Sequence, residues 1–211
     1  MGEACIPTAD LSPFVREDED GKKKAMEAIT QACSEYGFFQ IVNHGVSLDL
    51  IKEAMQPSKT FFDYSDEEKS KSSPSTNAPL PAGYSKQPLH SPDKNEFQLS
   101  LKTLPSSDGL LLESIINECL GLPTNFLKEF NHDRSWDFLL ALRYFPASNN
   151  DNNGITEHED SNILTFVIQD GVGGLQVLRN VEWIPAVPRG HYCGQWKRCY
   201  PGNSVFKCTK I

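Results

Sequence analysis

Apolar residues in the first third of the chain recur at spacings that predict a helix, a strand and a second helix. Over about residues 22–36 they recur every three or four positions, which predicts an amphipathic helix with one buried stripe. Gly37 follows where a helix-ending glycine is expected, and residues 38–42 form a β-prone run. A second helix is predicted over about residues 47–63, with Ser47 as its N-cap.

The middle of the chain is less regular. Pro57 is predicted to kink or divide the second helix, and residues 69–92, rich in Ser, Pro and Asn, are predicted to form a mobile loop. Gly173-Gly174 predicts a tight turn between two β-prone runs. Further helices are expected over residues 110–119 and 125–130, a short extended segment over residues 6–11, and a β-prone or buried run over residues 138–146.

The triplet His158-Glu159-Asp160 carries the first candidate chemistry. In an extended segment, side chains alternate between faces, so His158 and Asp160 point the same way. An imidazole beside a carboxylate makes two corners of a metal site, and the triad that holds non-haem Fe(II) needs one more histidine. Alone, this short pattern is more typical of a solvated polar turn, so the rest of the chain decides between the two interpretations.

The composition narrows the class of protein. The chain has 211 residues, which suits one globular domain or one domain with a helical extension. Its net charge is −8 and its basic residues form no broad face, so nucleic acids and anionic membranes are excluded as partners. With no export signal, no membrane-length apolar run and no CxxC, the six cysteines are expected to be reduced thiols in a cytoplasmic protein.

The histidines that precede the triplet give it no obvious partner. His44 stands alone in an Asn-His-Gly turn, where a hydrogen-bonded structural histidine is favoured over a ligand. His90 and His132 are isolated in polar segments.

Two long blocks resemble a known family. Residues 6–11, Ile-Pro-Thr-Ala-Asp-Leu, and residues 33–46, which contain Tyr-Gly-Phe-Phe-Gln-Ile-Val-Asn-His-Gly-Val, resemble the N-terminal region of plant 2-oxoglutarate/Fe(II)-dependent dioxygenases. Residues 158–177 resemble that family's "H-x-D-x-x-x-L-T-x-L-x-Q-D-x-V-G-G-L-Q-V". The resemblance implies an α+β fold, a distorted double-stranded β-helix (jelly roll) with packed N-terminal helices. It also implies that His158 and Asp160 are the first two iron ligands.

The resemblance further implies the cofactors Fe(II) and 2-oxoglutarate, with O₂ and a small plant metabolite as reactants and hydroxylation or desaturation as the reaction. We expect a monomer. Residues 138–146 resemble the strand "L-R-x-N-Y-Y-P", in which the second Tyr bonds 2-oxoglutarate in several members. Phe145 replaces that Tyr, Arg143 replaces the Asn, and Tyr144 is predicted to point to the opposite face from Phe145. The sequence therefore identifies no residue that binds 2-oxoglutarate.

The pattern fails beyond Pro188. Residues 189–202 show neither strand alternation nor a core face, and a shifted reading frame of the same codons permits a strand like that of the family. We therefore hypothesise that this segment is translated out of frame. Residues 203–210 resemble the family's "N-x-x-F-K-C" again, which puts the third iron ligand at Ile211, and His191 is the only histidine after the triplet.

The chain is thus predicted to comprise an N-terminal dioxygenase region (1–100), connecting helices (101–135), the first part of the jelly-roll core (136–188) and an aberrant tail (189–211). A jelly roll incomplete at the C-terminus would leave open strand edges and uncovered apolar side chains. Two functional hypotheses stay open. One is an oxygenase of this family, here inactive for lack of the second His and the Arg that clamps 2-oxoglutarate; the other is a non-catalytic truncated product acting at most as a binding module.

Overall fold

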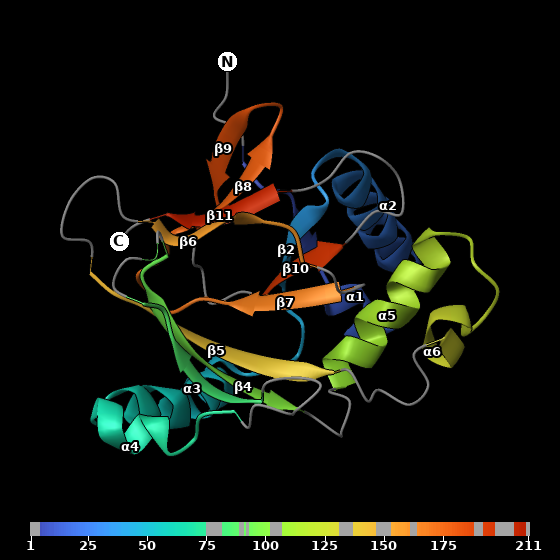
Figure 1. Cartoon of the computed structure of the whole chain (residues 1–211). Helices are drawn as coiled ribbons and strands as arrows, with labels where there is room; N and C mark the ends of the chain where they lie inside the picture. The colour runs from blue at the N-terminus through green and yellow to red at the C-terminus, as the bar shows by residue number, and fades with distance from the viewer. Residues whose placement is uncertain are drawn as a thin grey trace.

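The computed structural model places helices along the outside of three sheets (Figure 1). It describes residues 5–74, 82–88, 91, 93–101, 107–130, 137–146, 153–160, 164–187, 192–196 and 205–209. Among the described residues, no helix is long and apolar enough to cross a membrane.

The first long helix, α2 (Glu19–Glu35), begins three residues earlier than its apolar spacing predicts. The Asp18 side chain accepts a hydrogen bond from the Gly21 N–H, so the cap lies inside the acidic run that precedes the apolar stripe. At the other end, Gly37 adopts a φ of 65° and its N–H bonds the Ala32 carbonyl at 3.0 Å. This is the predicted glycine stop, and it turns the chain directly into β2 (Phe38–Val42).

Strand β2 lies in the middle of the core because both of its faces are buried. Phe39 and Ile41 pack towards α2 and α5 (Ser107–Cys119), and Phe38 packs towards β8 (Leu175–Arg179) and β9 (Glu182–Pro185). β1 (Thr8–Asp10) pairs with β2 in parallel and leads into α1 (Ser12–Arg16). The predicted strand over residues 38–42 is confirmed to the residue.

The next segment narrows one prediction and corrects another. α3 (Leu48–Phe62) is capped by Ser47 as predicted, but it continues through Pro57 and is not divided. The predicted loop over residues 69–92 contains the end of α4 (Asp66–Ser70) and all of β3 (Gly83–Lys86). β3 pairs antiparallel with the next strand, β4 (Asn95–Leu101), and its Gly-Tyr-Ser-Lys composition does not reveal this strand.

Three sheets make up the β-structure. Their strand orders are β1-β2-β10-β7, β6-β11-β8-β9 and β3-β4-β5. The remaining elements are α6 (Phe126–Phe130), β5 (Phe138–Tyr144), β6 (Asn153–His158), β7 (Leu164–Ile168), β10 (Tyr192–Trp196) and β11 (Val205–Thr209).

The tail contains two strands, although residues 189–202 show no strand alternation in the sequence. β10 lies between β2 and β7, antiparallel to both, and β11 lies between β6 and β8. Sheet pairing uses main-chain N–H and C=O groups, which every residue except proline carries, so a strand can form without an alternating side-chain pattern. The out-of-frame hypothesis itself stays a prediction.

Strand β5 has one open edge in the described part of the chain. Among the described strands it pairs only with β4, and β7 pairs only with β10. Four apolar side chains of β5 are at least one-third exposed: Phe138, Leu139, Leu140 and Leu142. An apolar strand with an unpaired edge is a template for association with another chain.

We predict that Leu139→Lys reduces self-association without unfolding the protein. Leu139 is 50% exposed, so the change loses little buried area while placing a charge on the edge strand. Val15→Lys is the matched control, because Val15 is 62% exposed on α1. Light scattering and size exclusion should show less association for Leu139→Lys only; equal effects of the two variants would contradict a role for the β5 edge.

Candidate metal centre

The structure brings His158 and Asp160 together. His158 is the last residue of β6, and Asp160 lies two residues beyond the strand end. The Nε2 atom of His158 is 3.6 Å from Oδ1 of Asp160, and their side chains are 34% and 24% exposed. The predicted pair therefore faces the same way from a partly open position.

The His158 ring is held by its other nitrogen. Nδ1 lies 2.8 Å from the carbonyl oxygen of Thr156, and because a carbonyl can only accept, Nδ1 carries the hydrogen. The Nε2 lone pair is then directed towards Asp160. A backbone carbonyl that bonds the distal ring nitrogen is typical of metal-ligating histidines, since it fixes the tautomer and the ring orientation.

This donor pair fits a divalent metal ion. With metal–ligand bonds of about 2.1 Å, two donors in adjacent coordination positions lie roughly 3 to 4 Å apart, and the observed separation of 3.6 Å falls in that range. One neutral imidazole and one carboxylate are also two-thirds of the donor set that non-haem Fe(II) takes. Within the described residues, no third His, Cys, Asp or Glu completes a group of three.

Of the other four histidines, the described part of the chain includes only His44. His44 is buried, and its Nδ1 accepts a hydrogen bond from the Val46 N–H at 3.3 Å. That confirms the structural role predicted for it. His90, His132 and His191 lie outside the described residues, as does Ile211.

The start of β4 fixes the start of β6. Asn95 is 1% exposed and its Nδ2 donates to the Gly154 carbonyl at 2.7 Å, while the Lys94 N–H donates to the same oxygen at 3.2 Å. The Tyr144 ring lies so close to Gly154 that an added Cβ would be 2.7 Å from it. The start of β6 thus lies against the paired ends of β4 and β5, at a position where any Cβ would clash with the Tyr144 ring.

Arg143 and Phe145 do not form a 2-oxoglutarate site in this structure. The Arg143 guanidinium donates to the Phe62 carbonyl at 2.6 Å and lies 3.6 Å from Glu96 and 3.5 Å from Asp63. It is therefore used to join β5 to the end of α3. Phe145 has no hydroxyl, and its ring lies 5.5 Å from the Lys86 ammonium.

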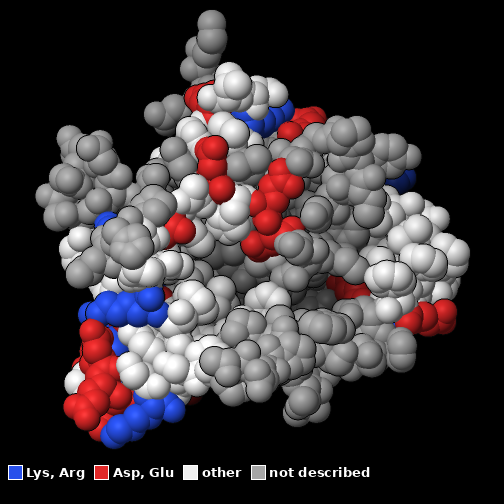
Figure 2. Space-filling view, viewed as in Figure 1, with Lys and Arg blue, Asp and Glu red and all other residues white. Residues whose placement is uncertain are grey.

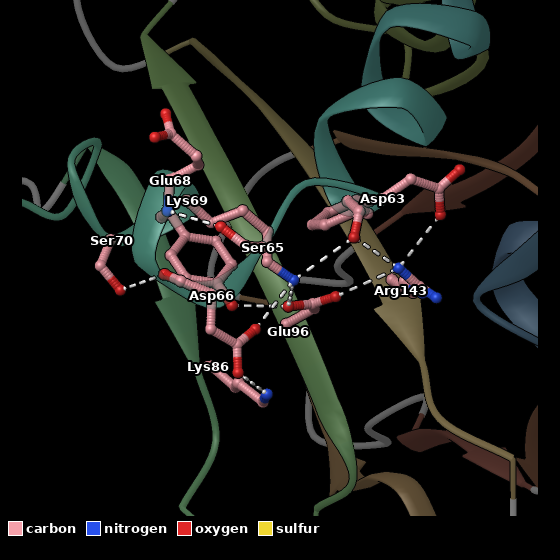
Figure 3. Close-up of polar contacts among 11 residues, drawn as sticks. Asp63, Ser65, Asp66, Glu68, Lys69, Ser70, Lys86, Glu96 and Arg143 are labelled. Carbon is pink, nitrogen blue, oxygen red and sulfur yellow. Dashed lines mark hydrogen bonds and ion pairs between the residues drawn. The ribbon is translucent and has the colours of Figure 1, made fainter.

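A buried charge cluster that the sequence pattern does not indicate lies under β4 (Figure 3). Glu96 has a fully buried side chain, and its Oε2 accepts from Lys69 at 2.8 Å and from the Tyr84 hydroxyl at 2.6 Å. Lys69 also lies 3.2 Å from Asp66. A lysine in a polar segment is ordinarily exposed, so no local pattern predicts that this one is buried.

The buried charge cluster raises the pKa of Tyr84 and the pKa of Lys69. Burial and the hydrogen bond to Glu96 raise the pKa of Tyr84. Burial acts to lower the pKa of Lys69, but its hydrogen bonds to Glu96 and Asp66 outweigh burial and raise that pKa overall. Both groups therefore stay protonated in the folded protein.

The visible face of the molecule carries charges of both signs. Figure 2 shows mixed basic and acidic side chains over α3 and α4, and mainly acidic groups higher on the same face. The described part of this face shows no broad basic patch.

Two family models match the chain. One, described as the N-terminal region of the non-haem dioxygenase in morphine synthesis, matches residues 6–110; the other, the 2OG-Fe(II) oxygenase superfamily, matches residues 136–193. The chain belongs to the 2-oxoglutarate- and Fe(II)-dependent oxygenases. The second match includes both His158 and Asp160 and ends within β10.

Two curated proteins that are similar to this chain come from plants. Gibberellin 2-beta-dioxygenase 8 of Arabidopsis thaliana is 31% identical over 209 residues, covering 88% of this chain and 61% of that protein. Deacetoxyvindoline 4-hydroxylase of Catharanthus roseus is 29% identical over 213 residues, covering 87% of this chain and 52% of that protein. The chain therefore spans about three fifths or less of the length of these two relatives.

Solved structures show the same fold. A full-length Neurospora crassa protein in complex with alpha-KG and 5-formyluracil has a TM-score of 0.78 at 21% identity, covering all of this chain and 80% of that protein. JOX2 with 2OG, Fe and JA has a TM-score of 0.77 at 20% identity, covering 98% of this chain and 71% of JOX2. The predicted α+β jelly-roll class is confirmed.

We predict that Gly154→Ala destabilises the protein by about 1–3 kcal/mol, the usual cost of overpacking. The new methyl group would meet the Tyr144 ring, so β6 must shift away from β5. Gly171→Ala is the matched control, because nothing lies within 4 Å of its added Cβ. Urea unfolding of both variants measures the difference, and an equal midpoint for the two would refute the close contact.

We also predict that stability falls as the pH rises above about 10, the ordinary pKa of tyrosine. The folded pKa of Tyr84 is raised, so the unfolded chain releases that proton first and is favoured increasingly from about pH 10 upward. Lys69 contributes in the same direction. The slope of unfolding free energy against pH should be shallower in Tyr84→Phe than in the exposed control Tyr64→Phe; identical slopes would show that Tyr84 is not responsible.

Proposed function

We propose that His158 and Asp160 are iron ligands of an oxygenase that hydroxylates or desaturates a small plant metabolite. One observation carries the proposal: Nε2 of His158 faces Oδ1 of Asp160 at 3.6 Å while Nδ1 is held by a backbone carbonyl. A solvated polar turn gives no reason for a fixed tautomer, whereas a ligand requires one.

The roles of the two residues follow from their donors. The His158 imidazole supplies a neutral nitrogen, and the Asp160 carboxylate supplies an anionic oxygen that offsets part of the metal charge. When bound, iron activates O₂ with 2-oxoglutarate as the co-substrate. The protein holds the two donors at the end of a strand, where both side chains are partly exposed.

We further propose that the 211-residue polypeptide, taken as it stands, binds iron too weakly for turnover. The described residues supply two protein donors, and two donors hold Fe(II) less firmly than the three of a facial triad. Arg143 is committed to Phe62, Asp63 and Glu96, and Phe145 lacks the hydroxyl of the family tyrosine, so neither supports binding of 2-oxoglutarate. These observations favour the alternative of a non-catalytic binding module for this polypeptide.

Monomeric state and cytoplasmic location stay predictions. The described thiols support the cytoplasmic location, because Cys5, Cys33 and Cys119 are free. Burial, with a smaller contribution from Cys119, raises the pKa of Cys33 to about 12, so this thiol stays protonated. Thiols that persist unpaired are typical of reducing compartments.

The test compares the 211-residue chain with a chimera in which the residues after Pro188 are replaced by the corresponding C-terminal part of gibberellin 2-beta-dioxygenase 8. Each is mixed anaerobically with Fe(II) and 2-oxoglutarate, and the charge-transfer absorption band and succinate release on adding O₂ are measured. We expect both signals from the chimera and neither from the 211-residue chain.

The ligand assignment is tested within the chimera. His158→Ala should abolish both signals, and the matched control Glu157→Ala, one residue earlier on β6, should keep them. Signals that survive His158→Ala would refute the assignment. Succinate release by the 211-residue chain would refute the weak-binding proposal alone.

A further inference from the structure

A second carboxylate, Asp93, is hydrogen-bonded to the residue that orients His158. Asp93 precedes β4, and its Oδ1 accepts a hydrogen bond from the Thr156 N–H at 2.5 Å and another from the Thr156 hydroxyl. Both donors of Thr156 therefore converge on one oxygen atom. Asp93 is itself held by its own N–H, which donates to the Ser91 hydroxyl at 3.2 Å.

Thr156 connects this carboxylate to the metal-site histidine. Its N–H and hydroxyl bond Asp93, and its carbonyl bonds Nδ1 of His158 at 2.8 Å. Thr156 is exposed, so packing does not fix its position. β6 pairs with β11 at Ile155 and at His158, with a register shift between these two positions, and within that irregular stretch both hydrogen-bond donors of Thr156 bond Asp93.

We propose that Asp93 is a positioning residue that sets the tautomer and orientation of His158 through Thr156. The inference rests on the proposed iron-binding role of His158. With Asp93 in place, the Thr156 carbonyl keeps the hydrogen on Nδ1 and directs Nε2 to within 3.6 Å of Asp160. Loss of this anchor removes the bonds that hold the Thr156 peptide to Asp93, and so weakens the hydrogen bond by which the Thr156 carbonyl orients the His158 ring.

The expected effect is that of an outer-sphere partner of a metal ligand. Loss of such a partner weakens metal binding by about 10- to 100-fold. Asp93→Ala removes the acceptor of both Thr156 donors. Asp93→Asn keeps an acceptor oxygen at the same place, so it should restore most of the affinity.

The first measurement uses the metal-free 211-residue protein, so it does not depend on iron. Long-range ¹H–¹⁵N correlation spectra report which ring nitrogen of each histidine carries the hydrogen, and His158→Gln assigns the His158 signals. We expect the Nδ1–H tautomer in the unmodified protein and in Asp93→Asn, and a shift towards Nε2–H in Asp93→Ala. Asp18→Ala, which removes the α2 cap, is the control for a general loss of stability.

The second measurement is titration with Co(II) as a probe of the same site, and it should show weaker binding for Asp93→Ala than for Asp93→Asn. An Nε2–H tautomer in the unmodified protein, or an Asp93→Ala variant with unchanged tautomer, would overturn the proposal. If the tautomer changes as expected and Co(II) binds none of the proteins, the positioning role is supported and the iron-binding proposal fails.

Discussion

The buried carboxylate of Glu96 is the constraint on which the candidate site depends. A fully buried carboxylate is stable only when it is paired and hydrogen-bonded, and Lys69 and Tyr84 supply those bonds from α4 and β3. Breaking such a pair by removing one partner typically costs about 3–5 kcal/mol. The ion pair therefore commits β4 to one position against the helices.

Neighbouring residues of β4 face opposite sides of the strand. Fixing the strand at Glu96 therefore also fixes the residues of β4 that contact β6. Glu96 faces the charge cluster, while Asn95 is buried against Gly154 at the start of β6. Asp93, just before the strand, holds Thr156 further along β6. The end of β6, which carries His158, is thus fixed by contacts that begin in a cluster with no part in the chemistry. Metal ligands are typically oriented by residues that hydrogen-bond them from outside the site, and these contacts place His158 in that way.

Much of this fold could be predicted from the sequence where local pattern decides structure. The strand at Phe38–Val42 and the glycine stop at Gly37 were predicted because periodicity and backbone preference are local properties. β3 was missed because its short Gly-Tyr-Ser-Lys sequence shows no apolar alternation, and β10 was missed because its partner β2 is distant in the chain. His158 and Asp160 were predicted together because residues 158–177 resemble the family motif, whereas their spacing alone favoured a polar turn. Asp93 was missed because 63 residues separate it from Thr156, and no spacing rule joins them.

The central claim is that His158 and Asp160 together form a metal site, to which the described residues supply one imidazole. Pulsed EPR of the protein loaded with vanadyl ion, a spectroscopic probe of divalent metal sites, detects coordinated imidazole nitrogens directly. We predict imidazole coupling that is lost in His158→Ala and weakened in Asp160→Ala. Coupling that persists unchanged in His158→Ala would contradict the account.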